Sequence, residues 1–346
     1  MSAALEYVLE RPPELATSLP LAAGIEWLRL PVPGGLRHIN VWLLDDGDGC
    51  TLVDTGMNVA ESRAAWEGPL GATLRGRPLR RIVCTHHHPD HAGLAAWLAE
   101  RHGAQVLMTA PEYDLVHYLY ASQGDAVEID ARLAHYAANG LLATAENRSI
   151  LAGEGYLRVM SGLPPVVQIL RPGEVLNAGG RRWDVLQLAG HTDGQLLLHD
   201  ADAQLLIAGD QVLPRISSNI GIYPERRDPD PLDSFLDGFE RLAALAPGTL
   251  VLPSHGEVFR GLGARLTQLR RHHLERLEVL EGLLQGAPAT AAEIALRLYR
   301  GALDPLNRML ALGETLAHLR YLEVRGRAAI EAPPTGPRRY LASCGG

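Results

Sequence analysis

The chain has 346 residues, of which 47% are hydrophobic and 21% are charged, a balance that predicts a folded protein and excludes a disordered one. Its formal net charge is −8, yet residues 260–346 hold 13 arginines against 8 acidic residues. The acidic remainder argues against general nucleic-acid binding, and only the basic tail leaves that alternative open. All 32 basic residues are arginines, so lysine has no part in any catalytic scheme.

Cysteine usage and the N-terminal segment bear on the compartment. Cys50, Cys84 and Cys344 are scattered and form no Cys-x-x-Cys pair, so we expect neither a disulfide framework nor a thiolate metal site. Residues 1–18 carry early acidic side chains and no apolar core of a signal peptide. No apolar run reaches the roughly 20 residues of a membrane span. We therefore expect a cytoplasmic protein.

The first part of the chain predicts strands around a histidine-rich loop. Apolar runs separated by Asp/Gly turns between residues 25 and 56 predict strands joined by hairpins. The patterns that follow predict a helix at 60–74, a strand at 80–86, a helix at 91–103 and a strand at 104–110. The histidines thus lie where a strand passes into a helix, which is where α/β folds commonly place ligands.

A helical segment interrupts the strands. Residues 111–162 predict helices and carry few strand signals, so this insertion is placed to wall or cap a site. Beyond it the predicted elements are strands at 165–170, 181–190, 194–200 and 203–210, an amphipathic helix at 229–248 and a last strand at 249–256.

After about residue 259 the chain changes character. Helix patterns at 262–286, 290–300 and 311–330 follow one another, and the last ends in a turn and a short apolar strand. Three helices and a wing are the outline of a winged helix. We therefore predict a catalytic domain at 1–260, which contains the helical insertion, and a winged-helix-like domain at 261–346.

The segment CTHHHPDHAG, residues 84–93, concentrates four histidines and one aspartate in six positions. Histidines two apart on an extended or turning segment point the same way, so His86 and His88 can share a metal ion while His87 points away. Asp90 and His91 follow at the turn into the helix and can face a second ion. Imidazole and carboxylate are the ligands that zinc, iron and manganese accept.

Two metal ions need more ligands than this loop offers. His191, Asp210 and His255 each follow an apolar strand, so one sheet edge can gather them. Singly, each has a plain interpretation as a turn or cap residue, but together with the histidine loop they favour a metal site. Asp210 is the kind of acid that can bridge two ions through its oxygens.

These motifs together resemble the metallo-β-lactamase-fold hydrolase superfamily. The matching pieces are TLVDTG (51–56), THHHPDHAG (85–93), GHTDGQ (190–195), AGD (208–210) and PSHG (253–256), within a resemblance that covers roughly residues 20–260. The resemblance implies an α/β (α+β) protein, an αββα sandwich with its site on one edge, and two divalent ions, with zinc as first choice and iron or manganese as alternatives. It implies these roles: His86, His88 and His191 for one ion, Asp90, His91 and His255 for the other, Asp210 as bridge and Asp54 as the group that orients a ligand.

The tail and the loop after Asp210 bear on the substrate. LGETLAHLRYLEVRGRA (312–328) resembles the glyoxalase II-like branch that contains β-lactamase-like protein 2 and related thioester hydrolases. We therefore predict a binuclear hydrolase in which Asp90 and Asp210 hold a metal-activated water that attacks a thioester or ester.

Other activities of the superfamily fit the sequence less well. A lactonase and a phosphodiesterase or endoribonuclease are the alternatives. The lactonase tyrosine three residues after the bridging aspartate is replaced by Leu213, and the 44 residues between Asp210 and His255 leave no room for a nuclease insertion. The absence of lysine argues against glutathione thioesters.

The loop at 211–231 offers side chains for a small-molecule substrate. We predict that Arg215, Ser218, Asn219 and Tyr223 contact it, with an ordered surface loop as the alternative. No membrane partner is expected, and a homodimer is left open.

Overall fold

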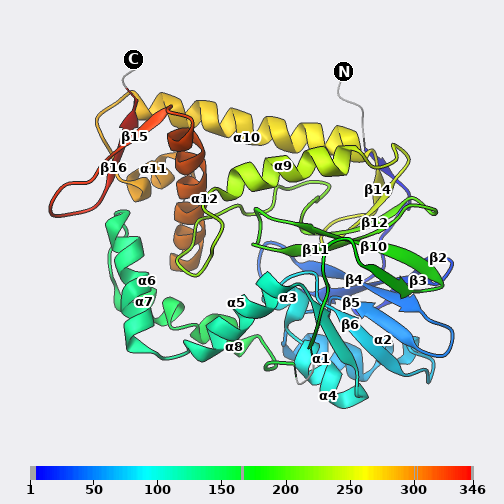
Figure 1. Cartoon of the computed structure of the whole chain (residues 1–346). Coiled ribbons are helices and arrows are strands. Elements are labelled where there is room, and N and C mark those ends of the chain that lie inside the picture. The colour runs from blue at the N-terminus through cyan, green and yellow to red at the C-terminus, as the bar shows by residue number, and fades with distance from the viewer. Residues whose placement is uncertain (1–4, 165–166, 300, 302, 344–346) are drawn as a thin grey trace.

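The computed structural model describes residues 5–164, 167–299, 301 and 303–343. Two seven-stranded sheets pack face to face, and helices cover their outer faces (Figure 1). The expected αββα sandwich is confirmed. Parts of the predicted strand at 165–170 and of the predicted helix at 290–300, together with Cys344, fall outside the described residues.

The first sheet is built from the N-terminal half of the chain. Its strands, in spatial order, are β2 (Ser18–Ala22), β3 (Ile25–Pro31), β4 (His38–Asp45), β5 (Cys50–Val53), β6 (Leu79–Val83), β7 (Gln105–Met108) and β8 (Val167–Ile169). Strands β5 to β8 run parallel, whereas β2 to β5 form antiparallel hairpins. The carboxyl ends of β5 and β6 therefore lie at the same edge.

The second sheet comes mainly from the later half of the chain. Its order is β1 (Glu6–Tyr7), β14 (Phe259–Arg260), β13 (Leu250–Pro253), β12 (Leu205–Gly209), β11 (Gln195–Asp200), β10 (Arg181–Leu188) and β9 (Val175–Ala178). Strands β12 and β13 are parallel. The sequence did not predict β1, β2, β9 or β14, because the two-residue strands and the partly exposed β2 and β9 carry little apolar periodicity.

Four short helices belong to this half of the chain: α1 (Ala60–Glu67), α2 (Pro69–Thr73), α3 (Pro89–Ala92) and α4 (Ala95–His102). Of these, α1 and α4 cover the outer face of the first sheet, whereas α3 follows the end of β6 (Figure 1). Each of the two helices predicted here is therefore divided in two. The division between α3 and α4 falls at Gly93, where a Cβ atom would lie 2.8 Å from the carbonyl oxygen of Gly56. This close approach packs the start of the helix against the turn after β5.

The predicted insertion is helical throughout: α5 (Ala110–Ala121), α6 (Ala126–Ala138), α7 (Ala145–Leu151) and α8 (Glu154–Arg158). The C-terminal part contains α9 (Pro231–Ala243), α10 (Leu262–Leu284), α11 (Ala291–Leu298), α12 (Pro305–Val324) and the hairpin β15 (Ala328–Glu331) and β16 (Arg339–Ala342). The order from α10 to β16 is that of the predicted helices and wing. The proposed boundary at residue 260 stays a prediction.

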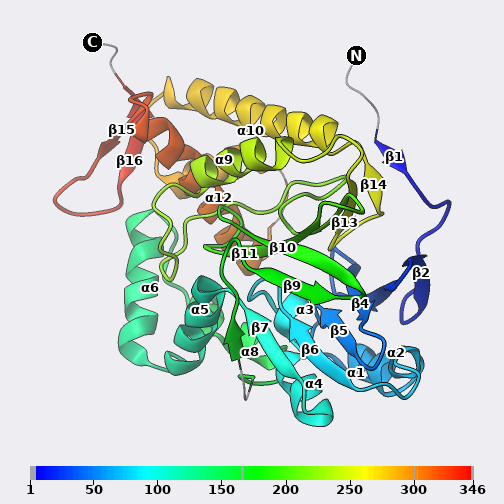
Figure 2. The ribbon, with the colours of Figure 1, turned by 45° about the vertical axis from the view of Figure 1, so that its right-hand side comes forward.

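The insertion packs on the C-terminal part of the chain. The amide of Ala292 donates to the carbonyl of Asn139 at 3.0 Å, and the Tyr340 hydroxyl donates to the Asn139 side chain at 3.2 Å. The amide of Arg338 donates to the carbonyl of Ala138 at 2.8 Å. Figure 2 shows α6 lying below the β15–β16 hairpin. The insertion and the C-terminal part, which are more than 100 residues apart in sequence, are thus in direct contact.

Three apolar clusters hold the layers together. One lies between the sheets and includes Trp27 and Trp42 of the first sheet with Trp183 of the second. A second joins the first sheet to α1 and α4. The third joins the second sheet to α9, α10 and α12, so the C-terminal helices share a core with the sandwich. None of the helices in the described ranges combines the length and apolar character that a membrane span requires.

A buried pair of histidines lies where α10 packs against α12. His273 Nδ1 and His318 Nε2 are 3.2 Å apart, and both side chains are almost fully buried. Burial lowers the pKa of His273 to about 2 and that of His318 to about 4. Histidines of an unfolded chain titrate near pH 6.5, so acid protonates them there before it protonates the folded pair.

The pair should therefore make folding sensitive to acid. Each histidine should lower the unfolding free energy by up to about 1.4 kcal/mol per pH unit as the pH falls from about 6.5 towards 4. We expect His273→Gln to flatten the dependence of urea-unfolding free energy on pH between 7.5 and 5. His117→Gln, which changes an exposed histidine, is the control. Parallel curves for His273→Gln and the wild type would contradict this assignment.

Candidate metal centre

Five strands end at one edge of the sandwich and carry the predicted metal-site residues there. Asp54 follows β5 and the histidine loop follows β6 in the first sheet, whereas Asp210 follows β12 and His255 follows β13 in the second. Each pair of strands is parallel, so the carboxyl ends meet. His191 follows β10, which runs in the same direction as β12. Register in two sheets therefore gathers residues that are up to 201 positions apart.

The first ligand group is His86, His88 and His191, whose ring nitrogens lie within 4.8 Å of one another. His86 Nε2 is 2.9 Å from His88 Nδ1. His191 Nε2 is 3.4 Å from Asp210 Oδ2. The structure thus brings together the three side chains that the resemblance assigns to one ion.

The second ligand group is Asp90, His91 and His255, again within 4.8 Å of one another. Asp90 Oδ2 lies 3.3 Å from His255 Nε2 and 3.7 Å from His91 Nε2. Asp210 Oδ1 lies 3.5 Å from the Nε2 atoms of His91 and His255. Because the other oxygen of Asp210 faces His191, this carboxylate spans both groups, as a bridging ligand must.

The donor atoms of the site fit metal ions. His91 Nε2, His191 Nε2, His255 Nε2 and Asp210 Oδ1 are buried, and none has a hydrogen-bond partner in the described part of the chain. A buried polar atom without a partner is costly, so four that converge on one place call for a ligand. Nitrogen and oxygen donors suit zinc, iron or manganese alike.

Each of three imidazoles is held through its other ring nitrogen. The contacts are His91 Nδ1 to Asp54 Oδ2 at 2.8 Å, His191 Nδ1 to the Asn219 carbonyl at 2.8 Å and His255 Nδ1 to the His38 carbonyl at 2.7 Å. A proton on Nδ1 leaves the Nε2 lone pair free for an ion, which is how surrounding groups orient histidine ligands.

Asp54 is the most constrained of these supports. Its carboxylate accepts hydrogen bonds from the Thr85 amide at 2.8 Å and the Thr85 hydroxyl at 2.9 Å, besides the contact with His91. Its φ angle is +62°, a left-handed conformation that aspartate tolerates better than most residues. The structure thus shows the contact that the predicted orienting role of Asp54 requires.

The two groups differ in electrostatic environment. Burial and the neighbouring imidazoles hold the pKa values of His86 and His88 well below the ordinary range. Burial also lowers the pKa of His91, but the carboxylates of Asp54, Asp90 and Asp210 outweigh it and raise the pKa well above that range. His86 and His88 are therefore neutral imidazoles, whereas carboxylates surround His91 in the second group and attract cations.

His87 points away from both groups and contacts Glu112 of α5 instead. Glu112 Oε2 accepts from the His87 amide at 2.9 Å and lies 2.6 Å from His87 Nδ1, while its Oε1 accepts from the Gly194 amide at 3.0 Å. The Tyr156 hydroxyl of α8 donates to the His87 carbonyl at 2.6 Å. The insertion therefore braces two loops of the site. Sequence reasoning missed Glu112, because an acid in the first turn of a helix is ordinary.

His38 and Asn40, at the start of β4, brace the turn that carries His255. The Gly256 amide donates to His38 Nε2 at 2.9 Å, and burial lowers the pKa of His38 to about 4, which keeps this nitrogen an acceptor. Asn40 Nδ2 donates to the carbonyls of Pro253 at 2.8 Å and Gly256 at 2.9 Å. Nothing in the sequence marked these residues, because their partners lie more than 200 positions away.

The predicted substrate residues lie on the loop beside the site, and three of them hold that loop. The Ser218 hydroxyl donates to the Asp210 carbonyl, and the Tyr223 hydroxyl donates to the Asn219 side chain. Arg215 is exposed and pairs with Glu257 at 3.1 Å. Substrate contact stays a prediction for all four.

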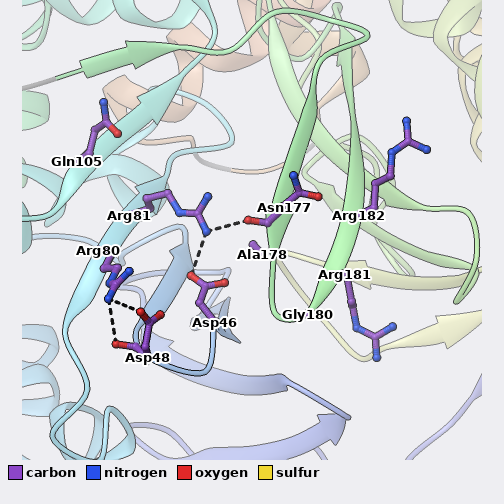
Figure 3. Close-up of a pocket in the computed structure, with 10 residues that line it drawn as sticks. All are labelled: Asp46, Asp48, Arg80, Arg81, Gln105, Asn177, Ala178, Gly180, Arg181 and Arg182. Atoms are coloured by element: carbon purple, nitrogen blue, oxygen red, sulfur yellow. Dashed lines mark hydrogen bonds and ion pairs between the residues drawn. The ribbon is translucent and has the colours of Figure 1, made fainter.

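A cavity of about 710 Å³ lies at the other end of β6, between the turn before β5 and the β9–β10 hairpin (Figure 3). Four arginines line it, but each has a carboxylate partner: Arg80 with Asp48, Arg81 with Asp46, Arg181 with Asp200 and Arg182 with Asp184. None of the predicted metal ligands lines this cavity. Its charge is neutralised locally, and the chemistry lies at the opposite edge.

Comparison with known proteins agrees with this geometry. The family profile described as "Metallo-beta-lactamase superfamily" matches residues 34–255, and that of "Metallo-beta-lactamase-like, C-terminal domain" matches residues 277–343. A crystal structure of a beta-lactamase domain protein from Burkholderia ambifaria superposes with a TM-score of 0.86 at 36% identity, covering 98% of this chain and 97% of that one.

Two curated relatives align along most of their length. The probable metallo-hydrolase YqjP of Bacillus subtilis is 26% identical over 307 residues, which cover 86% of this chain and 91% of that protein. The acyl-coenzyme A thioesterase MBLAC2 of Homo sapiens is 26% identical over 303 residues, which cover 82% of this chain and 96% of that protein.

Removing the carboxylate behind His91 should weaken metal binding. In Asp54→Asn, an amide NH2 meets hydrogen-bond donors of Thr85 or His91, so we expect affinity for zinc to fall about 10- to 100-fold. Competition with a chelator measures this. Asp48→Asn, at the opposite end of the strands, is the matched control. If Asp54→Asn held zinc as tightly as Asp48→Asn, the orienting role would be refuted.

Proposed function

The chain belongs to the metallo-beta-lactamase superfamily of metal-dependent hydrolases, and from this premise we propose that it hydrolyses acyl thioesters at a centre of two divalent ions. The observation that carries the proposal is the convergence of buried, unpartnered donor atoms from His91, His191, His255 and Asp210. Zinc is the proposed metal, with iron and manganese as alternatives.

The chain's own residues set up the reaction. His86, His88 and His191 would hold one ion, Asp90, His91 and His255 the other, and Asp210 both. When bound, the ions supply a water activated near neutral pH and polarise the thioester carbonyl. The carboxylates of Asp90 and Asp210 would accept hydrogen bonds from that water and so orient it. Its oxygen becomes part of the carboxylic acid, the carbon–sulfur bond breaks, and the released thiol takes up the proton.

The cavity next to the Asp210 loop supports a thioester with an anionic carrier. It has a volume of about 370 Å³ and is lined by Arg215, Ser217, Ser218, Arg265, Arg276 and Glu314, among others. Arg265 is buried and donates to the carbonyls of Leu213 and Ile216, with no carboxylate ion pair within the described ranges. Arg276 stacks on the Tyr299 ring with 4.8 Å to the centroid. Arg215 pairs with Glu257 and Arg276 faces Glu314, so the three arginines exceed these two carboxylates by one positive charge, which favours an anionic group such as a phosphate.

A relative supports the same substrate class. The human protein whose name specifies acyl-coenzyme A hydrolysis aligns with 82% of this chain. Coenzyme A carries phosphates at the far end of its thiol arm, which is the chemistry that the arginine-lined cavity accepts. A carrier of this kind also needs no lysine, in keeping with the all-arginine composition.

The metal dependence has a direct test. Purified protein should hold about two equivalents of metal and hydrolyse acyl-coenzyme A, and Asp210→Ala should lose both together. Asp202→Ala, which changes an exposed aspartate before β12, should retain both. A panel of acyl-glutathione, lactone, phosphodiester and short RNA substrates tests the competing activities. Full activity of metal-free protein would refute the proposed metal centre. Cleavage of a lactone or of RNA, but of no thioester, would refute the proposed substrate class.

The anionic carrier has its own test. We expect Arg276→Gln to raise KM for acyl-coenzyme A about tenfold, the loss of about 1.4 kcal/mol from one charged contact, with kcat unchanged. KM for acyl-pantetheine, which lacks the phosphates, should not move. Arg271→Gln, on the exposed side of α10, is the control. Arg215→Ala should act in the same direction without loss of metal. Equal increases in KM for acyl-coenzyme A and acyl-pantetheine would show that this cavity does not bind the phosphates of the carrier.

A further inference from the structure

Helix α12 packs closely against the loop that follows Asp210, the predicted bridging ligand. The amide of Ile222 donates to the carbonyl of Gly313 at 3.0 Å. A Cβ atom on Gly313 would lie 2.4 Å from Tyr223 Cε1, so the tyrosine ring lies directly on the helix backbone. Glycine at 313 is therefore what allows α12 and this loop to approach so closely.

A chain of hydrogen bonds leads from this contact to a metal ligand. The Tyr223 hydroxyl donates to the side-chain oxygen of Asn219, and Asn219 Nδ2 donates to Glu314 Oε2 at 3.3 Å. Both ends of the Asn219 side chain are thus occupied. The carbonyl oxygen of the same residue accepts the proton on His191 Nδ1 at 2.8 Å. The position of that carbonyl depends on what holds Asn219.

We propose that Glu314 and Gly313 of α12 are positioning residues for His191. Glu314 accepts a hydrogen bond from the Asn219 side chain. Gly313, which has no Cβ atom, leaves room for the Tyr223 ring, whose hydroxyl donates to the same side chain. With its Nδ1 proton donated to the Asn219 carbonyl, the His191 ring keeps its Nε2 lone pair directed at the site, 3.4 Å from Asp210 Oδ2. The inference rests on the proposed role of His191 as a ligand.

The two ligand groups depend on different parts of the chain. His91 is held by Asp54 and His255 by the carbonyl of His38, and both supports belong to the first half of the chain. Only His191, among these three imidazoles, is held through a residue bonded to the C-terminal helices. Loss of the Glu314 contact should therefore weaken one of the two metal equivalents and leave the other in place.

Glu314 offers a conservative variant that keeps the contact. A glutamine at this position retains a carbonyl oxygen that can accept from Asn219 Nδ2 and from the Tyr299 hydroxyl, which also hydrogen-bonds Glu314. Arg276 and Tyr299 are the charged and titratable groups that face Glu314 from α10 and from the end of α11. Alanine removes the acceptor altogether, so the pair of variants separates the hydrogen bond from the rest of the packing.

The test measures metal binding on the full-length protein, without substrate. Metal-free protein is titrated with zinc against a competing chelator. We expect Glu314→Ala to weaken one equivalent about tenfold, the lower end of what loss of a supporting partner causes, and to leave the other within twofold. Glu314→Gln should bind both equivalents like the wild type. Glu323→Ala, which changes another glutamate of α12, is the control.

Gly313→Ala gives an independent variant that keeps Glu314. It displaces the Tyr223 ring and should also weaken one equivalent. Unchanged zinc binding by both Glu314→Ala and Gly313→Ala would overturn the inference, and so would parallel weakening of both equivalents with a matching loss of thermal stability. The wild type could bind two zinc ions, and the variants could weaken only one of them, while the wild type cleaves no thioester. That result would refute only the proposed function.

Discussion

The site depends on one constraint: parallel strands in each of two sheets must end at a common edge. The pairing of β5 with β6 places Asp54 beside the histidine loop, and that of β12 with β13 places Asp210 beside His255. The apolar layer between the sheets holds the two edges in register. The seven predicted ligands can converge only while both sheets keep this arrangement, because no single loop contains more than four of them.

Convergence alone would leave the imidazoles free to rotate. The structure removes that freedom by binding the second nitrogen of three of them, once to a carboxylate and twice to backbone carbonyls. The nitrogens that remain are buried without partners, a state that a folded chain tolerates mainly where a ligand replaces the missing contacts. Burying these nitrogens without partners costs folding free energy, and the same unpartnered nitrogens are the atoms that can bind cations.

The parts added to the sandwich serve the same site from opposite sides. The insertion contributes Glu112 and Tyr156, which brace the histidine loop, and the C-terminal helices contact the loop after Asp210. These additions also contact each other, since α6 ends against α11 and β16. The second sheet shares an apolar core with α10 and α12, so the C-terminal part packs as a continuation of the sandwich.

The sequence by itself predicted a metal site at a sheet edge, and its resemblance to the superfamily predicted the layers of the sandwich. The spacing His-x-His-x-Asp-His needs only local backbone geometry to be interpreted, and the apolar strands that precede His191, Asp210 and His255 made these residues candidates for the remaining ligands. It could not identify the supports, since two of them are backbone carbonyls, which carry no residue identity, and others, such as Glu112 and His38, are single polar residues with distant partners. The sequence pattern also did not predict the short strands or the division of two helices. A two-residue strand and a close backbone approach at Gly93 leave no periodic pattern in the sequence. Only the tertiary structure decided which nitrogen of each histidine faces the site, because that choice depends on atoms brought near by packing and not by proximity in sequence.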